Sequence, residues 1–395
     1  MDSMKQVKFN GSGDEYFKIW IVNVLLSIVT FGIYYPWAKV RTRRYFYANT
    51  EYAGRFFDYH ATGKQLFLGY LIGVVILIVI QVISFIVPAA SIILPIVLFA
   101  VIPWIVWRSL QFNMRMTSFS NVRFGFIGQL KTAYFVYMLL PILGYLAVIG
   151  LIVIGFGSMT GFSGISGSTD FSPIGVLVFI LASIFALVLS VYMAGLFIKK
   201  STEYQIGHTK FGQGRFLIDV DTKTFAKIAL KTGLIAMATV GVFVLIFGLI
   251  FGSVVAGSID DPENVLAMFG FIFGFMIAYF GFIAASLFIA AYSYSRQRQY
   301  IFANTTLDER IHFKSTVAAK SYFVVLITNM LLVLFSAGLA TPWAKVRVAQ
   351  YLADNTWIDA DDMDINQYLT NKQNEQSAIG EEIGDVLDID INIAI

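Results

Sequence analysis

The sequence contains no cysteine, which excludes disulfide bonds, thiol nucleophiles and thiolate metal sites. It also has few charged residues, which make up 13% of the 395 residues, whereas a soluble domain has about 25%. Hydrophobic residues make up 57%, and the mean hydropathy is +0.73. These values predict an integral membrane protein. The net charge of +3 is too small to indicate binding to nucleic acid.

Six apolar segments are long enough to cross a hydrocarbon core, which takes about 17–25 helical residues. They are about 66–88, 91–107, 132–156, 173–198, 228–254 and 264–294. We predict that all six are helices, because open strands in lipid leave backbone groups unsatisfied. The polar residues 1–15 contain no signal-peptide core, and the tail 359–395 is acidic. The membrane domain is therefore predicted to span residues 16–358.

An internal repeat brackets these segments, because residues 16–50 return as residues 322–356 without a gap. Matching pairs are Asn23 and Asn329, Gly32 and Gly338, Pro36 and Pro342, Trp37 and Trp343, and Thr50 and Thr356. We favour two re-entrant segments, 16–35 and 321–340, that turn near the glycines and leave both termini inside. The alternative is eight spans with both termini outside.

Basic residues occur on only one set of connections between the six segments. Lys and Arg occur in residues 38–65, 108–131, 199–231 and 296–320. The opposite connections, 88–91, 155–172 and 257–264, contain neither. The positive-inside rule predicts a multi-pass protein of the bacterial inner (plasma) membrane with its four basic arms in the cytoplasm.

A shorter pattern occurs five times, with a basic residue nine positions and an aromatic residue five positions before a threonine. The five sets are Arg41, Tyr45 and Thr50; Arg108, Phe112 and Thr117; Lys200, Tyr204 and Thr209; Arg296, Tyr300 and Thr305; and Arg347, Tyr351 and Thr356. This spacing is typical of a helix leaving the membrane, with its aromatic ring at headgroup depth. Two interpretations stay open: anchors that set helix depth, or sites that bind anionic lipid headgroups.

In four of the five copies, apolar residues then alternate around a short turn, which predicts a β-hairpin. The aromatic residues after the turn are Phe57, Phe124, Phe216 and Phe313. An isolated hairpin is marginal in water, so we expect the four to pack together or onto the helix ends as a small cytoplasmic collar. The fifth copy loses the pattern after Trp357. The predicted fold is an all-α multi-pass membrane protein with helical-hairpin repeats and short cytoplasmic β-hairpin arms.

The motifs that recur at the two ends of the membrane domain resemble the YjgN-type family of bacterial inner-membrane proteins. In the first copy they are Asn23, Leu25 and Leu26, then TFGIY at 30–34, PWAKVR at 36–41, and Asn49 with Thr50. The resemblance covers about residues 7–358. It implies a multi-pass membrane protein with a domain of unknown function, and it brings no catalytic residues. The second copy departs from the motif, with SAGLA at 336–340.

Catalytic chemistry has little support in the sequence. His60, His208 and His312 stand at different offsets from the recurring threonines, so we interpret them as surface histidines rather than as a metal site. Asp58 near His60 resembles an acid–base pair, but the sequence places no nucleophile beside it. We therefore predict that the protein is not an enzyme, with no catalytic residues, no metal site and no cofactor.

The central parts of the six apolar segments contain no charged residue, which disfavours ion pumping and proton coupling. Asn23 and Asn329 form the candidate intramembrane polar pair. They either bond to a neighbouring helix or flank a central polar pathway. The sequence thus suggests a facilitative transporter or channel-like protein for a neutral or amphipathic solute. The alternative is a membrane scaffold, or a lipid- or partner-binding protein, acting through the basic arms. The expected partner is the lipid bilayer, including anionic lipids, and not nucleic acid.

Overall fold

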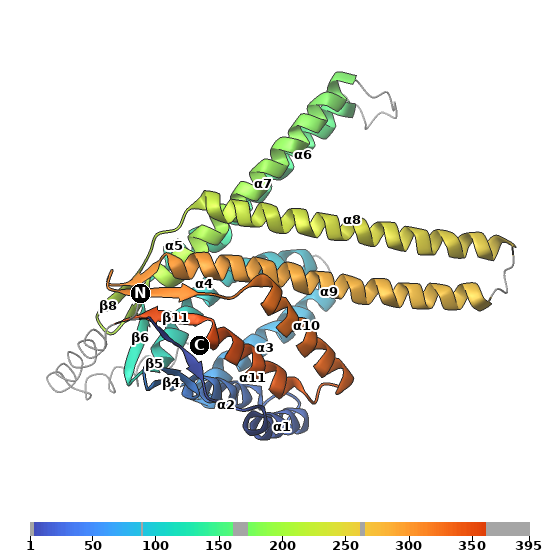
Figure 1. Ribbon diagram of the computed structural model, residues 1–395. Coiled ribbons are helices and arrows are strands. Elements are labelled where there is room, and N and C mark those ends of the chain that lie inside the picture. Colours follow the sequence, from blue (N-terminus) through green and yellow to red (C-terminus); the bar gives the residue numbers. More distant parts are fainter. Residues whose placement is uncertain (1–3, 88–89, 161–172, 261–264, 361–395) are drawn as a thin grey trace.

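The computed structural model describes residues 4–87, 90–160, 173–260 and 265–360, which form helices and one β-sheet (Figure 1). The helices are α1 (Gly13–Val29), α2 (Tyr35–Ala48), α3 (Gly63–Ile86), α4 (Ala90–Met116), α5 (Leu130–Tyr134), the π-helical η1 (Phe135–Leu139), α6 (Leu140–Thr160), α7 (Pro173–Gly207), α8 (Thr222–Asp260), α9 (Val265–Ala303), α10 (Ala319–Phe335) and α11 (Thr341–Asp354). The strands are β1 (Met4–Gln6), β2 (Lys8–Phe9), β3 (Thr50–Tyr52), β4 (Arg55–Tyr59), β5 (Thr117–Phe119), β6 (Val122–Phe126), β7 (Thr209–Phe211), β8 (Gly214–Ile218), β9 (Thr305–Leu307), β10 (Ile311–Ser315) and β11 (Thr356–Asp359). The chain thus alternates between helical segments and short strands.

The sheet is a near-closed barrel of antiparallel strands. From β2 through β3 to β11 each strand pairs with the next along the chain, and β11 then pairs with β1. Only Val7 separates β1 from β2, and its backbone N–H donates to the Thr356 carbonyl at 2.9 Å. The N–H of Asn10 donates to the Asn49 carbonyl at 2.8 Å. The N-terminal strands therefore cover both edges that an open sheet would leave unpaired.

The four expected β-hairpins are present, but they do not form separate arms. Three of their turns have two consecutive residues with positive φ, as in type I′ turns. These are Ala53 and Gly54, Ser120 and Asn121, and Asp308 and Glu309. Strands of successive hairpins also pair with each other, β4 with β5, β6 with β7 and β8 with β9. The hairpins therefore pack together as expected, but the prediction of an all-α fold was incomplete, because backbone hydrogen bonds join the hairpins into one sheet.

The fifth copy is completed in a way that its sequence pattern did not predict. Residues 356–359 form β11 although the alternating pattern stops there, and β11 pairs with β10 on one side and β1 on the other. Residues 1–15, expected to be only a polar segment, supply β1 and β2. Val7 and Phe9 are buried, and the lysine between them is exposed. β1 thus pairs with β11 in the place that the second strand of a fifth β-hairpin would occupy.

Among the described helices, six are long and apolar enough to cross a membrane. They cover Gly63–Ile86, Pro95–Met116, Leu130–Met159, Pro173–Gly207, Thr222–Gly252 and Ile272–Ala303. The long helices pack in pairs, α6 with α7 and α8 with α9, and these two hairpins project away from the sheet in diverging directions (Figure 1). The structure therefore supports a multi-pass membrane protein. The cytoplasmic position of the arms stays a prediction, and the expected acidic tail, 359–395, lies outside the described residues from 361 onward.

The two copies at the ends form short helical hairpins, α1–α2 and α10–α11. The chain reverses at Phe31 and Gly32 in the first and at Ala337 and Gly338 in the second, where all four residues have φ between 49° and 91°. Each glycine has the larger φ of its pair, 87° and 91°, a conformation that only glycine adopts without strain. The turns lie where the sequence analysis placed them, while the dip of these hairpins into a membrane stays a prediction.

The Pro–Trp pairs of the end copies join neighbouring hairpins. Trp37 on α2 packs against Gly63, the first residue of α3, and Trp343 on α11 packs against Gly13, the first residue of α1. A Cβ atom at either glycine would overlap the indole ring. The second contact joins the last hairpin to the first, and the indole Nε1 of Trp343 also donates to Asp14 at 3.0 Å. The last helical hairpin therefore contacts the first, just as β11 pairs with β1 in the sheet.

We expect Val7→Gln to lower the free energy of unfolding by about 2–4 kcal/mol, because it removes a buried apolar side chain and buries an amide. Val7 is 7% exposed and lies where the barrel closes. Thermal unfolding in detergent, followed by tryptophan fluorescence, measures the loss. Lys8→Gln is the matched control, since Lys8 is the next residue of the same segment and its side chain is exposed. Equal stability of the two variants would contradict closure by residues 4–9.

Candidate functional site

The five recurring threonines each begin a strand and close the C-terminal end of the preceding helix. In every copy the threonine hydroxyl donates to the carbonyl four residues earlier, and thereby satisfies an acceptor that the helix end leaves open. The bonds are Thr50 to Phe46 (2.8 Å), Thr117 to Asn113 (2.8 Å), Thr209 to Gln205 (2.7 Å), Thr305 to Ile301 (2.7 Å) and Thr356 to Leu352 (2.7 Å). The threonines therefore fix the helix-to-strand junctions.

The recurring aromatic residues lie at the base of their own helical hairpins. Four tyrosine hydroxyls bond to the backbone beside the first residue of the hairpin, and the fifth residue, Phe112, packs in a cluster with Tyr59 and Ala61. The hydroxyl bonds are Tyr45 to Ser12 (2.9 Å), Tyr204 to the Gln129 carbonyl (3.1 Å), Tyr300 from the Asp221 N–H (2.7 Å) and Tyr351 to the Ala318 carbonyl (3.4 Å). These contacts give the aromatic residues a role within the protein that needs no lipid.

Tyr45 illustrates the electrostatics of this contact. Its hydroxyl accepts from the Ser12 N–H and donates to the Ser12 carbonyl, each at 2.9 Å. Burial raises the pKa of Tyr45 to about 12, with a further contribution from the Glu15 carboxylate. The phenol is therefore neutral at physiological pH and keeps the proton that it donates.

Asn23 and Asn329 are bonded inside their own short hairpins. Each side-chain amide donates to a carbonyl of the second helix and accepts from an arginine of that helix. The contacts are Asn23 to Ala38 (3.4 Å) and Arg41 (3.4 Å), and Asn329 to Ala344 (3.1 Å) and Arg347 (3.4 Å). No hydrogen bond among the described residues joins the two asparagines. The structure thus bonds each asparagine within its own short hairpin, and a polar pathway flanked by the pair stays a prediction.

The five recurring cations share a sequence offset, but they do not share one kind of contact in the structure. Lys200 forms an ion pair with Glu203 at 2.8 Å. Arg296 is exposed and lies over the Tyr292 ring at 5.7 Å, and Arg108 is half-buried on α4. Arg41 and Arg347 bond to the asparagines of their own hairpins. The binding of lipid headgroups by these five residues stays a prediction.

The interior of the barrel contains a ring of aromatic side chains that the sequence analysis noted only as a strand pattern. The ring consists of Phe57, Phe124, Phe216, Phe313 and Ile358. Neighbouring phenylalanine centroids lie 6.5, 6.4 and 5.8 Å apart around it, and Phe313 is paired in register with Ile358. We call this set the phenylalanine ring. One residue comes from each hairpin, and the fifth comes from β11.

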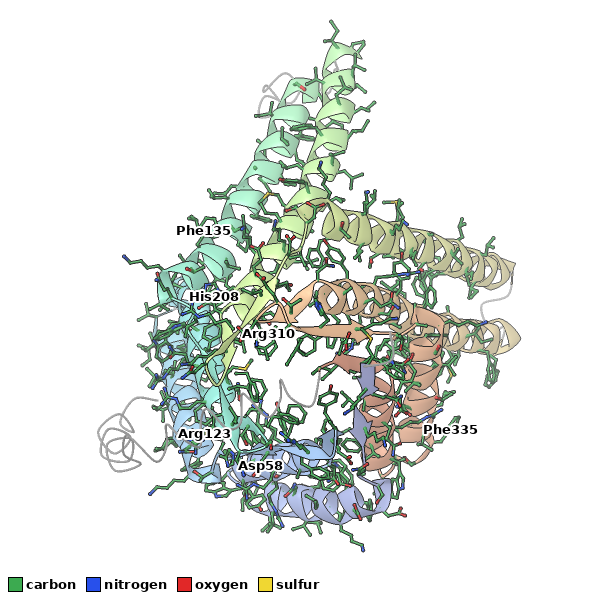
Figure 2. The ribbon with its side chains drawn as sticks, turned by 60° about the vertical axis from the view of Figure 1, so that its left-hand side comes forward. Asp58, Arg123, Phe135, His208, Arg310 and Phe335 are labelled. Carbon is green, nitrogen blue, oxygen red and sulfur yellow. The ribbon has the colours of Figure 1, made fainter. Side chains whose placement is uncertain are left out.

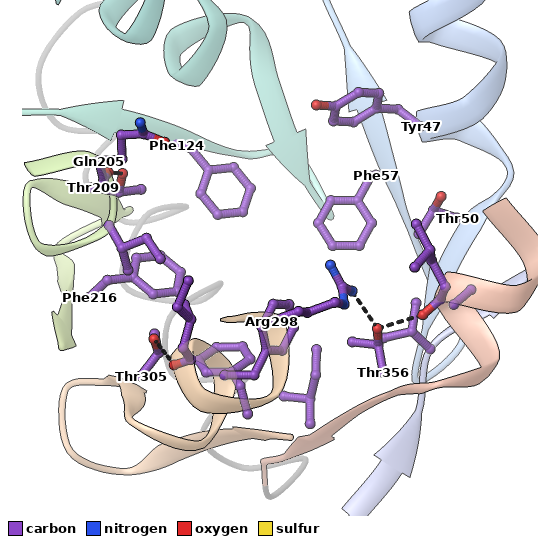
Figure 3. Close-up of a pocket in the computed structure, with 18 of the residues that line it drawn as sticks. Tyr47, Thr50, Phe57, Phe124, Gln205, Thr209, Phe216, Arg298, Thr305 and Thr356 are labelled. Carbon is purple, nitrogen blue, oxygen red and sulfur yellow. Dashed lines mark hydrogen bonds between the residues drawn. The ribbon is translucent and has the colours of Figure 1, made fainter. Parts of the chain in front are cut away.

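The helical hairpins are arranged in a ring around the barrel (Figure 2). A cavity of about 640 Å³ lies between the phenylalanine ring and the ends of the helices (Figure 3). Its walls include Leu110, Ile206, Ile301 and Leu352 from the helix ends. A smaller cavity of about 80 Å³ borders the same five ring residues and a second layer formed by the strands. That layer comprises Tyr52, Phe119, Phe211, Leu307 and Ile311. The phenylalanine ring therefore separates the two cavities.

The polar groups of the larger cavity are few. They include the junction threonines Thr50, Thr209, Thr305 and Thr356, the amide of Gln205, and the guanidinium of Arg298. Arg298 donates from Nη2 to the Thr356 hydroxyl at 2.8 Å, from Nε to Ser315 at 3.2 Å and from Nη1 to Tyr294 at 3.2 Å (Figure 3). Its guanidinium carbon also lies 4.3 Å from the centroid of the Phe302 ring. Polar contacts and an aromatic ring thus fix it at the cavity wall.

Arg298 was not among the residues predicted from the sequence, although its position contains one signal. It stands seven residues before Thr305, and the same offset from Thr50 gives Arg43. Arg43 donates to the Tyr59 hydroxyl at 2.8 Å and to the side chain of Asn113, and it is not among the residues that line the cavity. The offset therefore finds both arginines but does not show which of them faces the axis.

The pair of Asp58 and His60 acquires a third member in the structure. His60 Nε2 lies 2.7 Å from Ser118 Oγ, and His60 Nδ1 lies 3.8 Å from Asp58 Oδ2. Ser118 is 1% exposed, so a substrate carbonyl has no access to its hydroxyl. The second distance also exceeds a hydrogen bond. These residues therefore form a cross-strand polar cluster rather than a nucleophilic centre. In the described ranges no three His, Asp or Glu side chains come together as a metal site.

Comparison with known proteins confirms the resemblance found in the sequence. Residues 4–386 match the family described as a bacterial protein of unknown function, DUF898. The chain is similar to the inner membrane protein YjgN of Salmonella typhimurium, with 30% identity over 370 residues that cover 89% of this chain and 88% of the relative. It is 28% identical to YjgN of Escherichia coli K12, over 90% of this chain and 89% of the relative. No solved structure matches.

We expect Tyr300→Phe to lower the free energy of unfolding by about 1 kcal/mol, because it removes the acceptor of one backbone hydrogen bond at the base of the α8–α9 hairpin. Tyr279→Phe is the matched control, since Tyr279 lies on the same helix and is 51% exposed. Thermal unfolding of the purified protein compares the two. If Tyr300→Phe were as stable as the control, the hydroxyl would not hold the hairpin.

Proposed function

Because the chain belongs to the DUF898 family of bacterial proteins of unknown function, whose YjgN relatives are inner membrane proteins, we propose its function from the geometry. The protein is a facilitative, channel-like transporter of amphipathic solutes, which enter the cavity on the barrel axis. The observation that carries this proposal is the cavity itself. Its volume of about 640 Å³ lies within the range of about 300–1,000 Å³ that is typical of small-molecule sites.

The lining of the cavity favours a solute that is mostly apolar. Aromatic and aliphatic side chains from the helix ends and the phenylalanine ring form most of the wall, and the polar groups are a few hydroxyls, one amide and one guanidinium. Small-molecule sites commonly combine such walls with a few placed polar groups. A small hydrophilic solute would lose its hydration without enough partners to replace it. An amphipathic solute matches both parts of the lining.

The phenylalanine ring supports a channel-like mechanism. It forms an apolar constriction between two cavities on one axis, and apolar constrictions in channels close by excluding water. Such a constriction opposes ions more strongly than amphipathic molecules, because an ion would have to shed its water. This is consistent with membrane segments whose central parts contain no charged residue. In this proposal the barrel lies on the cytoplasmic side, at the end of the pathway.

The alternative, a scaffold that acts through its basic arms, has weaker support. Cations of the recurring motif such as Arg41, Arg347 and Lys200 form bonds within the chain. Those bonds compete with external partners, whereas most of the cavity wall consists of apolar side chains that make no such bonds.

Filling the cavity tests the proposal. We expect Ala353→Phe to slow solute movement several-fold, because Ala353 on α11 lines the cavity and a phenyl group there would occupy it. The assay follows NBD-labelled lysophosphatidylcholine, an amphiphile without net charge, in proteoliposomes, where dithionite quenches only the outer leaflet. Ala238→Phe on the exposed face of α8 is the matched control. A native protein that moves the probe no faster than protein-free liposomes would reject the transporter.

Widening the phenylalanine ring should have the opposite effect. We expect the double variant Phe216→Leu and Phe313→Leu to raise the rate of movement, because smaller side chains weaken the constriction. The paired control, Phe185→Leu with Phe273→Leu, changes two exposed residues on α7 and α9. The same assay compares both double variants with the native protein. An unchanged rate in the ring variant would show that the pathway does not pass through the ring.

A further inference from the structure

Arg298 is the one charged side chain among the described residues that line the axial cavity. It projects from the last turns of α9 into the space enclosed by the helices and strands, and its side chain is half-buried (Figure 3). Its surroundings include Ile301 and Phe302 of its own helix and Phe313 across the cavity wall. A full positive charge therefore faces a space that is otherwise almost wholly apolar.

This charge is not balanced by the chain in the described part of the structure. The three groups that accept from Arg298 are the hydroxyls of Ser315, Tyr294 and Thr356, which are all neutral. None of the ion pairs of the described residues includes it. An ionised group away from water is costly unless an opposite charge accompanies it. A negatively charged ligand group would remove that cost.

The guanidinium also has donors to spare for such a ligand. An arginine carries five N–H donors in a fixed plane, and the described hydrogen bonds of Arg298 engage three of them. A planar guanidinium binds carboxylate and phosphate oxygens through two parallel hydrogen bonds. The hydroxyls of Thr356 and Ser315 hold it in one orientation, which lowers the entropy that a ligand would otherwise lose on ordering it.

We propose that the axial cavity binds a single-chain amphiphile with an anionic head, either a carboxylate or a phosphate monoester. The head pairs with Arg298, and the acyl chain lies against the phenylalanine ring. This inference rests on the proposed function and gives its solute a chemical class. The neutral amide of Gln205 and the junction threonines add polar contacts around the head without adding a competing negative charge.

Arg43 shows that the recurring position alone does not produce this arrangement. It occupies the same offset in the first copy, but it lies over the Tyr59 ring at 5.3 Å and donates to Tyr59 on β4 and to Asn113 on α4 of the next helical hairpin. It does not line the cavity. The fold therefore uses one arginine of this pair to join hairpins and turns the other toward the axis.

Photocrosslinking tests the proposal on the full-length protein in nanodiscs of phosphatidylcholine. Three probes carry the same diazirine-labelled C16 chain and differ only in the head: a carboxylate, a phosphate monoester and an alcohol. Mass spectrometry quantifies the label on peptides that contain Phe216 and Phe313, across a range of probe concentrations. Arg298→Gln removes the charge and keeps a donor. Arg123→Gln is the matched control, because Arg123 on β6 is exposed, does not line the cavity and is not one of the five recurring cations.

We expect both anionic probes to label these peptides at lower concentration than the alcohol. Arg298→Gln should weaken the labelling by anionic probes by about 10- to 100-fold, since a charge-assisted hydrogen bond is lost. It should leave labelling by the alcohol within about two-fold of native, because the apolar wall is intact. Arg123→Gln should behave as native with all three probes. Nanodiscs doped with phosphatidylglycerol should not compete, which would distinguish a single-chain ligand from a two-chain anionic lipid.

Each other result overturns the inference in a distinct way. Equal labelling by the alcohol and the anions would show that the cavity takes amphiphiles without regard to charge, and the proposed function would stand. An equal loss for all three probes in Arg298→Gln would make the arginine a purely structural bridge between α9 and β11. Competition by phosphatidylglycerol would reassign the site to a lipid headgroup. Failure of all three probes to label the native cavity would reject the ligand class and the proposed function together.

Discussion

The antiparallel pairing of the N-terminal strands with β11 and β3 is the interaction on which the rest of the structure depends. Residues 4–9 contact both ends of a sheet whose other strands come from segments up to residue 359. Without them, β11 and β3 would be edge strands with unpaired backbone groups. With them, the barrel has an interior, and the side chains that point into it form layers around one axis. Val7 and Phe9 of this segment also line the cavity, so the closure completes its wall.

The helix-to-strand junctions connect the barrel to the membrane helices in a uniform way. In all five copies a threonine bonds to the carbonyl four residues earlier, so that the helix ends where the strand begins. In four copies a tyrosine one turn earlier in the helix reaches the base of the same hairpin. These short bonds fix the position of each hairpin relative to the sheet. The cavity is bounded by these junctions, so its shape depends on all five.

The chemistry of the interior follows from the same arrangement. Alternation along short strands sends one phenylalanine of each hairpin to the axis, and α9 brings a single guanidinium beside them. A site that is apolar over most of its surface and positively charged at one point favours a solute with an apolar chain and one anionic group. An anionic amphiphile fits this site, and its acyl chain is also compatible with the membrane in which the family resides. The channel-like function proposed for this member would move such a solute.

The sequence by itself determined the membrane character, the family, the turns at Gly32 and Gly338, and the four β-hairpins. These features depend on local properties, such as apolar length, alternation around a turn and the conformations open to glycine. The threonine positions were also evident, because the copies share one register. Only the tertiary structure decided that the hairpins join into one barrel, that residues 4–9 close it and that Arg298 rather than Arg43 faces the axis. Alternation shows which face of a strand is apolar but not which strand lies beside it. Pairing between distant segments uses backbone groups that every residue carries, so the order of the strands around the barrel leaves no mark in the side chains.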